Sequence, residues 1–155
     1  MAIEIERKFL LANDNWRSGV VKSINYRQGY LNSDKNSSVR VRVSDDTAKL
    51  NIKSATIGAQ RSEYEYSIPA EDAHELLSTL CRLPLVEKTR HIVIVGAHTW
   101  EIDEFKGDNQ GLIVAEIELN AADEVFEKLD WVGDEVTEDV RYYNNQLSRN
   151  PYSTW

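Results

Sequence analysis

Apolar and polar residues alternate with a period of two along much of the chain, which predicts β-strands with two unlike faces. In residues 3–9, for example, isoleucine and phenylalanine side chains fall on one face, while the charged side chains at positions 4, 6 and 8 fall on the other. Six segments show this alternation; in a seventh, charged residues run into an apolar stretch at residues 92–95 where alternation does not fix the faces, and residues 25–31 are added as an eighth. Together they predict strands at residues 3–9, 25–31, 39–43, 50–53, 63–68, 87–95, 100–103 and 115–119.

Clusters of Asn, Asp, Ser and Gly separate these segments, and such closely spaced strands are typical of an antiparallel barrel or sandwich. Helical signals are fewer. An acidic first turn followed by apolar residues at helical spacing predicts a helix over Pro69–Leu80. Ala121–Leu129 is a second predicted helix and Tyr142–Arg149 a weaker third. We therefore predict a mainly β (α+β) chain that forms one domain over residues 1–155.

Composition limits the classes of function. Of the 155 residues, 41% are hydrophobic, enough for a core, and the net charge of −8 argues against a nucleic-acid or anionic-membrane binder. A single cysteine, Cys81, excludes an internal disulfide and a cysteine-based zinc site. No apolar run approaches the ~20 residues that span a bilayer. Because Met1 to Glu4 also lack the features of a signal peptide, we expect a cytoplasmic protein.

Doubled like charges on the polar faces distinguish this chain from an ordinary half-exposed sheet. Side chains at positions i and i+2 of a strand lie ~7 Å apart on one face, so like charges there repel unless an opposite charge lies between them. Paired carboxylates suit a divalent cation, and paired bases suit an anion. The alternative is that these faces are simply solvated. The pairs are Glu4/Glu6, Arg40/Arg42, Glu63/Glu65, Lys88/Arg90 and Glu116/Glu118.

A closed eight-stranded barrel with these faces turned inward would explain the pairs. Its lumen would hold eight acids and six bases, a net charge of −2 that two Mg²⁺ ions would change to +2. Buried charges are tolerated when paired or metal-bound, so such a lumen indicates a site for a highly charged anion. The apolar outer faces would then need flanking helices or a partner chain, which makes a homodimer a hypothesis.

Charge is also uneven along the chain. Residues 101–139 carry fourteen acidic and two basic side chains, whereas residues 1–53 carry ten basic and six acidic ones. One interpretation is a metal-binding side that faces a phosphate-binding side. The other is an acidic, solvent-facing helix near residues 123–130.

The opening block Glu4-Ile5-Glu6-Arg7-Lys8-Phe9 resembles the N-terminal Glu-x-Glu-x-Lys motif of the CYTH superfamily, the triphosphate tunnel metalloenzymes. Further blocks resemble the family in the family's order and cover nearly the whole chain. They are residues 27–30, 39–42, 52–54, 63–65, 87–90, 101–103, 116–118 and 136–144. The chain is similar to the short bacterial-type inorganic triphosphatases of that superfamily.

The resemblance implies an eight-stranded antiparallel tunnel that binds triphosphates together with Mg²⁺ or Mn²⁺, with two ions expected. It implies metal ligands at Glu4, Glu6, Glu116 and Glu118, with Glu63, Glu65 and Asp103 as further candidates. It implies triphosphate-binding groups at Lys8, Arg40, Arg42, Lys53, Lys88, Arg90, Tyr30 and Arg141. Tyr30 has packing as its alternative role. The catalytic set that it implies is Glu4, Glu6, Lys8, Lys53 and Lys88.

The function implied is metal-dependent hydrolysis of inorganic tripolyphosphate to pyrophosphate and phosphate. Alternatives within the superfamily are a nucleoside or thiamine triphosphatase and a class IV-type adenylate cyclase. A different class is a non-catalytic sensor that binds polyphosphate or a nucleoside triphosphate. The retained carboxylates favour an enzyme, because a sensor could dispense with them. The expected partner is a small triphosphate molecule, with neither nucleic acid nor membrane.

Overall fold

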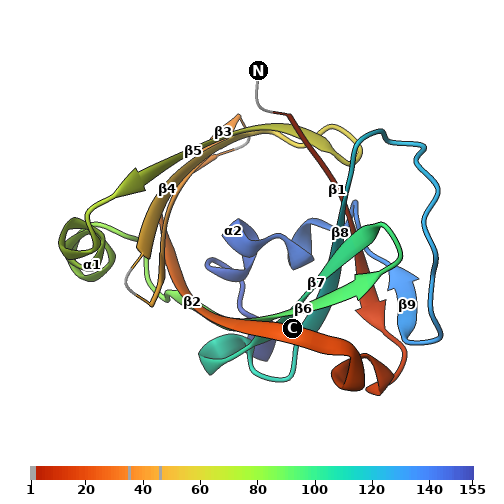
Figure 1. The fold of residues 1–155 in the computed structure, drawn as a ribbon. Helices are drawn as coiled ribbons and strands as arrows, with labels where there is room; N and C mark the ends of the chain where they lie inside the picture. Colours follow the sequence, from red (N-terminus) through yellow and green to blue (C-terminus); the bar gives the residue numbers. More distant parts are fainter. Residues whose placement is uncertain (1–2, 35, 46) are drawn as a thin grey trace.

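Eight strands close into an antiparallel β-barrel, as the sequence predicts (Figure 1). The computed structural model describes residues 3–34, 36–45 and 47–155. The strands are β1 Ile3–Leu11, β2 Val20–Ser33, β3 Ser37–Ser44, β4 Thr47–Ser54, β5 Gln60–Ile68, β6 Val86–Val95, β7 His98–Phe105 and β8 Ile113–Leu119. Short 3₁₀ turns occupy Asn15–Gly19, Gly107–Asn109, Val140–Tyr142 and Tyr152–Thr154.

Strand β1 closes the barrel. Hydrogen-bonded neighbours run in the order β5-β4-β3-β2-β6-β7-β8-β1, and the first residues of β1 pair back to β5, with Glu4 opposite Arg61. A ninth strand, β9 (Val132–Glu135), pairs with the second half of the same edge. The sequence did not reveal β9, because Val132–Glu135 contains a single apolar residue and therefore shows no alternation. Gly133 is required there, since an added Cβ would lie 2.8 Å from the carbonyl oxygen of Leu10.

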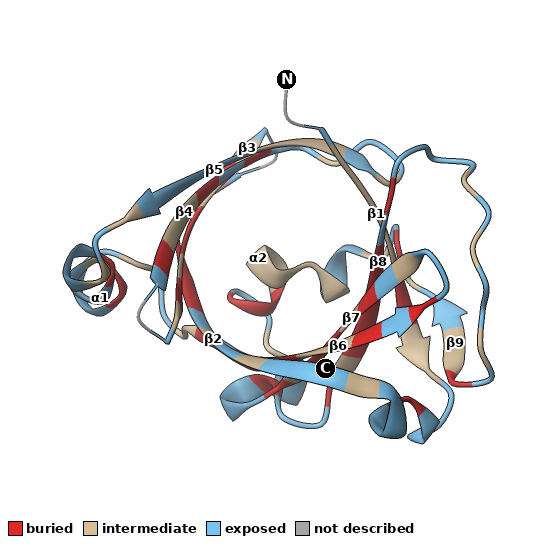
Figure 2. Cartoon of the chain, viewed as in Figure 1, coloured by how far each residue is buried: buried red, intermediate tan, exposed pale blue. Residues whose placement is uncertain are grey.

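The apolar outer faces of the strands are covered by elements from within the chain. Phe9 and Trp100 are fully buried in one cluster, outside β1, β7 and β8. Val41 and Val43 lie in another, beneath helix α1 (Ala70–Thr79), which confirms the first predicted helix. Figure 2 shows α1 against the outside of the barrel. Gly29 lets the segment after α1 approach, because a Cβ at this position would lie 2.8 Å from that of Cys81.

Part of the outer surface of β4 and β5 remains exposed, notably Ile52, Tyr64 and Tyr66. Whether a second copy covers these residues is not tested, so the homodimer stays a prediction. Within the described ranges, no helix is both long enough and apolar enough to cross a bilayer. Met1 and Ala2, on which the prediction of no signal peptide partly rests, lie outside those ranges.

The predicted helix over Ala121–Leu129 is wrong, because this segment has no regular secondary structure. Strand β8 ends with Leu119 opposite Ile5, and β9 begins with Val132 opposite Leu11, so the connection must run along about six residues of β1. That is ~20 Å of strand. After a turn at residues 121–124, the segment runs along β1 and inserts Phe126 edge-on against the rings of buried core residues.

The C-terminal segment enters one end of the barrel. Its helix α2 is short (Asn144–Leu147), and in Figure 1 it lies within the ring of strands, so the expectation that all helices flank the barrel is corrected for α2. Fully buried Leu147 packs there against Val86, Phe105 and Val114, which share inward-facing positions with charged residues of the same strands. The lumen is therefore apolar at this end and charged in its middle.

Candidate active site

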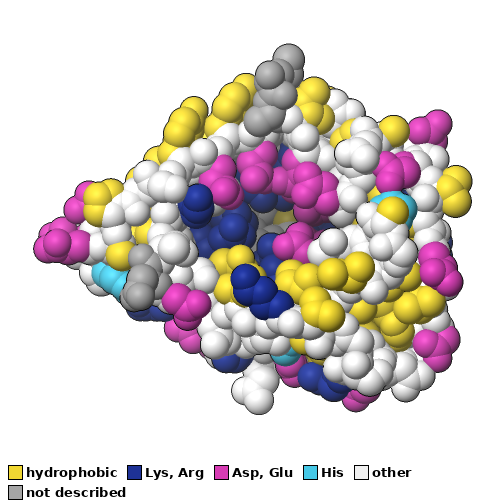
Figure 3. Space-filling view, in the orientation of Figure 1, with side chains coloured by type: hydrophobic (Ala, Val, Ile, Leu, Met, Phe, Trp, Pro, Cys, Tyr) yellow, Lys and Arg dark blue, Asp and Glu magenta, His cyan; other side chains and the backbone are white. Residues whose placement is uncertain are grey.

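The inward side chains of all eight barrel strands line a cavity of about 190 Å³. Figure 3 shows basic and acidic side chains gathered in this hollow. The bases are Lys8, Arg40, Arg42, Lys53, Arg61, Lys88 and Arg90; the carboxylates are Glu4, Glu6, Glu63, Glu101, Glu116 and Glu118. Seven bases and six carboxylates give a formal charge of +1, rather than the −2 expected from the sequence. The difference arises because Arg61 belongs to the cavity while Glu65 and Asp103 do not.

Carboxylates crowd together on β1 and β8. In the strand register Glu6 lies directly opposite Glu118, and Glu116 is two residues away on the same face. Burial, with further contributions from Glu116 and Glu4, raises the pKa of Glu6 to about 7. Burial and the nearby Glu4 and Glu101 also raise the pKa of Glu118. A cation beside Glu6 and Glu118 would therefore stabilise their ionised forms.

Two bases partly compensate the carboxylates. Lys8 lies between Glu116 and Glu6, with its Nζ 3.1 Å from Oε1 of Glu6. Arg61 donates to Glu4 at 3.0 Å, and although burial opposes the effect, Lys53 and Arg61 lower the pKa of Glu4 to about 2. Sequence reasoning missed Arg61. The available signal was its position two residues before Glu63, which places both side chains on one face of β5.

Positive charge is in excess on the inner faces of β3 and β4, which contribute three bases and no carboxylate to the cavity lining. Arg40 is 6% exposed, pairs with no carboxylate among the described residues, and has a buried Nε without a hydrogen-bond partner. Burial and the neighbouring Arg40 and Arg90 lower the pKa of Arg42 to about 10. Burial, followed by Arg40 and Arg61, also lowers the pKa of Lys53. Arg42 and Lys53 pair with Glu65 and Glu63, at 3.9 and 3.2 Å, but Arg40 leaves a buried positive charge to which an anion could bind.

Lys88 and Arg90 on β6 reach the cavity while held by a carboxylate behind them. Asp103 is fully buried, accepts from Nζ of Lys88 at 2.7 Å, and accepts from both Nε and Nη2 of Arg90. Burial, with a contribution from Arg90, nevertheless lowers the pKa of Lys88 to about 8. The structure therefore places Asp103 behind the cavity wall, where it orients two bases, rather than among the carboxylates that could reach a metal.

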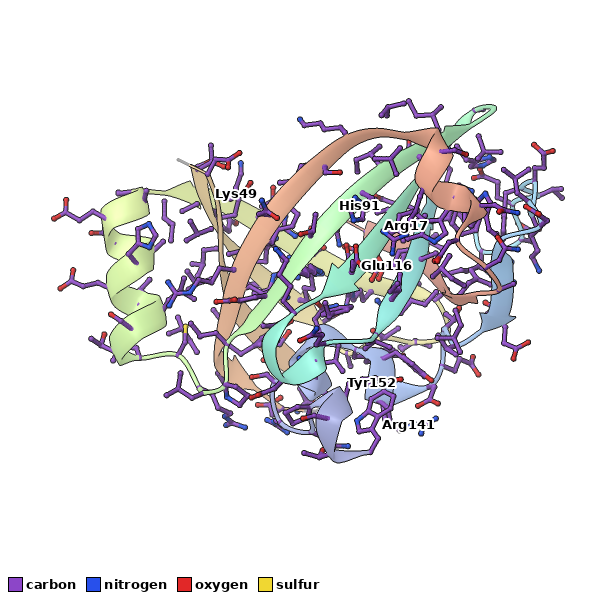
Figure 4. The ribbon with its side chains drawn as sticks, turned by 90° about the horizontal axis from the view of Figure 1, so that it is seen from below. Arg17, Lys49, His91, Glu116, Arg141 and Tyr152 are labelled. Carbon is purple, nitrogen blue, oxygen red and sulfur yellow. The ribbon has the colours of Figure 1, made fainter. Side chains whose placement is uncertain are left out.

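Of the other predicted residues, two line the cavity and two lie outside it. Tyr30 lies in the cavity wall and is 5% exposed, while Glu63 lines the cavity beside Lys53. Glu65 lies beyond the lining and accepts from Asn51. Arg141 lies outside the barrel (Figure 4), where it pairs with Asp139 and its guanidinium lies 5.0 Å from the Trp155 ring.

The residues present fit a magnesium or manganese ion whose coordination the substrate completes. Among the described residues, no three His, Cys, Asp or Glu side chains converge closely enough to hold a metal by themselves. Mg²⁺, however, commonly binds through one or two carboxylates, waters and substrate phosphates. Glu4, Glu6, Glu116 and Glu118 provide the oxygen ligands that such an ion prefers, and burial beside Glu116 raises the pKa of Glu6, so a nearby cation would favour its ionised form.

Comparisons with known proteins agree with this architecture. A curated inorganic triphosphatase from Acetivibrio thermocellus is 48% identical over 155 residues, covering 100% of this chain and 99% of that protein. An inorganic triphosphatase from Nitrosomonas europaea is 35% identical over 149 residues, covering 94% of this chain and 96% of that protein. The crystal structure of the inorganic triphosphatase NE1496 superposes with a TM-score of 0.68 and 33% identity, over 96% of this chain and 95% of that one.

A putative adenylate cyclase from Bacillus halodurans superposes with a TM-score of 0.54 over 79% of this chain and 84% of that one, but at 14% identity it shows only a shared fold. The family model of the CYTH domain matches residues 2–151. The match extends over nearly the whole chain, and the cavity described above lies within it. The chain therefore belongs to the CYTH family.

Proposed function

We propose that this protein hydrolyses inorganic tripolyphosphate to pyrophosphate and phosphate inside its barrel, with two Mg²⁺ or Mn²⁺ ions. The observation that carries the proposal is the enclosed excess of bases on β3 and β4, above all Arg40, which has no ion pair among the described residues, together with the carboxylates of β1 and β8, which Lys8 and Arg61 compensate only in part. A linear anion that also binds metal ions would satisfy both walls at once. The two curated relatives, both called inorganic triphosphatases, support this substrate class.

Phosphoryl transfer depends on positioning and on neutralising charge, with little covalent help from the protein. Arg40, Arg42 and Lys53 would bind phosphate oxygens, since all three line the cavity and Arg40 forms no ion pair among the described residues. Lys88 and Arg90 would present further donors in orientations fixed by Asp103. The carboxylates of β1 and β8 would hold the metal ions, which when bound neutralise phosphate charge and lower the pKa of a coordinated water.

The lining favours an inorganic substrate over a nucleotide. A pocket for a nucleobase would be largely apolar, with a few polar groups for specificity. Most of the side chains around this cavity are charged, and its two aromatic ones among the described residues are Tyr30 and Tyr143. Experiment should separate this function from the alternatives, which are a nucleoside or thiamine triphosphatase, an adenylate cyclase and a triphosphate-binding sensor.

We expect the purified protein to release phosphate from tripolyphosphate in the presence of Mg²⁺ or Mn²⁺, faster than from ATP or thiamine triphosphate. The measurement is a colorimetric phosphate assay with all three substrates, together with cyclic AMP quantification in the ATP reaction. Formation of cyclic AMP without phosphate release from tripolyphosphate would favour the cyclase. Binding of tripolyphosphate with no turnover under any metal would favour the sensor.

Replacing Glu118 with Gln should lower metal-dependent turnover about 100-fold or more, because a metal-binding carboxylate is lost. Glu118 makes no ion pair among the described residues, so its neutralisation should leave the fold intact. Glu4→Gln should act in the same direction. The measurement is phosphate release over a range of Mg²⁺ concentrations, with thermal melting to verify folding. The exposed Glu71→Gln on α1 is the control, and unchanged turnover in Glu118→Gln would refute the metal assignment.

Arg40→Ala should raise KM for tripolyphosphate about 10- to 100-fold with a smaller effect on kcat, because a charge-assisted hydrogen bond to the substrate is lost. The matched control is Arg27→Ala, which removes an arginine whose charged group forms a solvent-exposed pair with Glu87. Steady-state kinetics at saturating metal would measure both constants. Equal KM values for Arg40→Ala and the wild type would show that the unpaired guanidinium is not a substrate contact.

The stability of the metal-free protein should fall as the pH rises. Burial with Glu116 and Glu4 raises the pKa of Glu6 from 4.5 to about 7, so between these values the folded chain retains a proton that the unfolded chain has released. The stabilisation from this retained proton is complete below pH 4.5, the pKa of the group in the unfolded chain. It falls by at most about 3 kcal/mol as the pH rises towards about 7, the pKa in the folded chain. Urea denaturation between pH 5 and pH 7 with a chelator should show the loss. Glu6→Gln should flatten the pH dependence relative to the wild type, and parallel profiles would contradict the assignment.

A further inference from the structure

Asn144 is held inside the barrel by contacts that do not involve the substrate. It is the first residue of α2, whose Leu147 is fully buried in the apolar end of the lumen. The hydroxyl of Ser148, next along the chain, donates to the carbonyl oxygen of Pro84 at 3.2 Å. Asn144 thus has a fixed place in the lining of the cavity.

The chemistry of its neighbours fixes the orientation of the Asn144 amide. Nζ of Lys88 lies 3.0 Å from Oδ1 of Asn144, and because an ammonium group can only donate, the atom facing it must be the amide oxygen. Nε2 of the fully buried Gln28 donates to the same oxygen at 2.9 Å. The oxygen of Asn144 is therefore occupied by two donors. Its Nδ2 has no hydrogen-bond partner in the described part of the chain.

The same contact constrains Lys88. Its ammonium group has three N–H donors, of which one goes to Asp103 at 2.7 Å and a second to Asn144. Lys88 is 1% exposed yet lines the cavity, so the third donor is left for a ligand there. Asp103 from the barrel wall and Asn144 from the C-terminal segment together determine where that donor points.

We propose that Asn144 is a further substrate-binding residue: its Nδ2 donates to a triphosphate oxygen, and its Oδ1 aims the free N–H of Lys88 at the same anion. The proposal rests on the proposed function, because it assumes a triphosphate in the cavity. It makes the C-terminal segment part of the substrate site and gives that segment more than a role in filling the end of the barrel.

Asn144→Asp and Asn144→Ala separate substrate binding from a purely structural role. The aspartate keeps an oxygen for Lys88 and Gln28 but turns a second oxygen, in place of the NH₂ donor, towards the phosphates. The alanine removes all of these contacts without adding charge. We expect tripolyphosphate to bind about tenfold more weakly to Asn144→Ala and about 100-fold more weakly to Asn144→Asp. A purely structural role predicts wild-type affinity in a folded Asn144→Ala, whereas the aspartate would repel the anion in either case.

The measurement is isothermal titration calorimetry with tripolyphosphate in a chelating buffer, with thermal melting of each variant to verify folding. Asn150→Asp makes the same substitution at an exposed position of the same segment and should bind as the wild type does. Wild-type affinity in a folded Asn144→Ala, or in Asn144→Asp, would overturn the inference and leave the proposed function standing. If the wild type neither binds nor hydrolyses tripolyphosphate, the proposed function fails and the inference falls with it.

Discussion

The enclosure of thirteen charged side chains in one cavity is the constraint on which the rest of this structure depends. A closed barrel turns every second residue of each strand inward, so charges on those positions cannot escape to bulk water. Burial is tolerable only where each charge finds a partner. Lys88, Arg90 and Asp103 pair with one another, whereas Arg40 has no ion pair among the described residues, and burial beside Glu116 raises the pKa of Glu6 to about 7. The unsatisfied groups are those that a metal-bound triphosphate would complete.

The cavity and the chain as a whole carry formal charges of opposite sign. The chain carries a net charge of −8, yet its cavity has a formal charge of +1. Net charge governs solubility and non-specific association, while a ligand responds to the groups within a few ångströms of it, where water is scarce and screening is weak. The acidic surface is thus compatible with an anionic substrate, provided that the substrate enters as a complex with cations or is drawn in at short range.

The C-terminal segment links folding to the site. Leu147 packs on apolar inward-facing residues at one end of the lumen, and this contact brings Asn144 to Lys88 and Gln28. The segment that fills the barrel end therefore also fixes the direction of a basic group in the cavity. Such a contact joins residues 56 positions apart in sequence, Lys88 and Asn144, and a separation of this kind leaves no periodic signal.

The sequence by itself determined the side of the sheet on which each strand residue lies. Period-two alternation placed Glu4, Glu6, Arg40 and Lys53 on one inner surface, because the geometry of a strand fixes that choice locally. Only the tertiary structure decided depth and neighbourhood. It placed Asp103 behind the wall and Glu65 beyond the lining, brought Arg61 in across the closing pair of β1 and β5, and left residues 121–129 without a helix between two strands that meet β1 at distant points. The physical reason is that alternation sets direction alone, while strand register, barrel closure and chain reach set position.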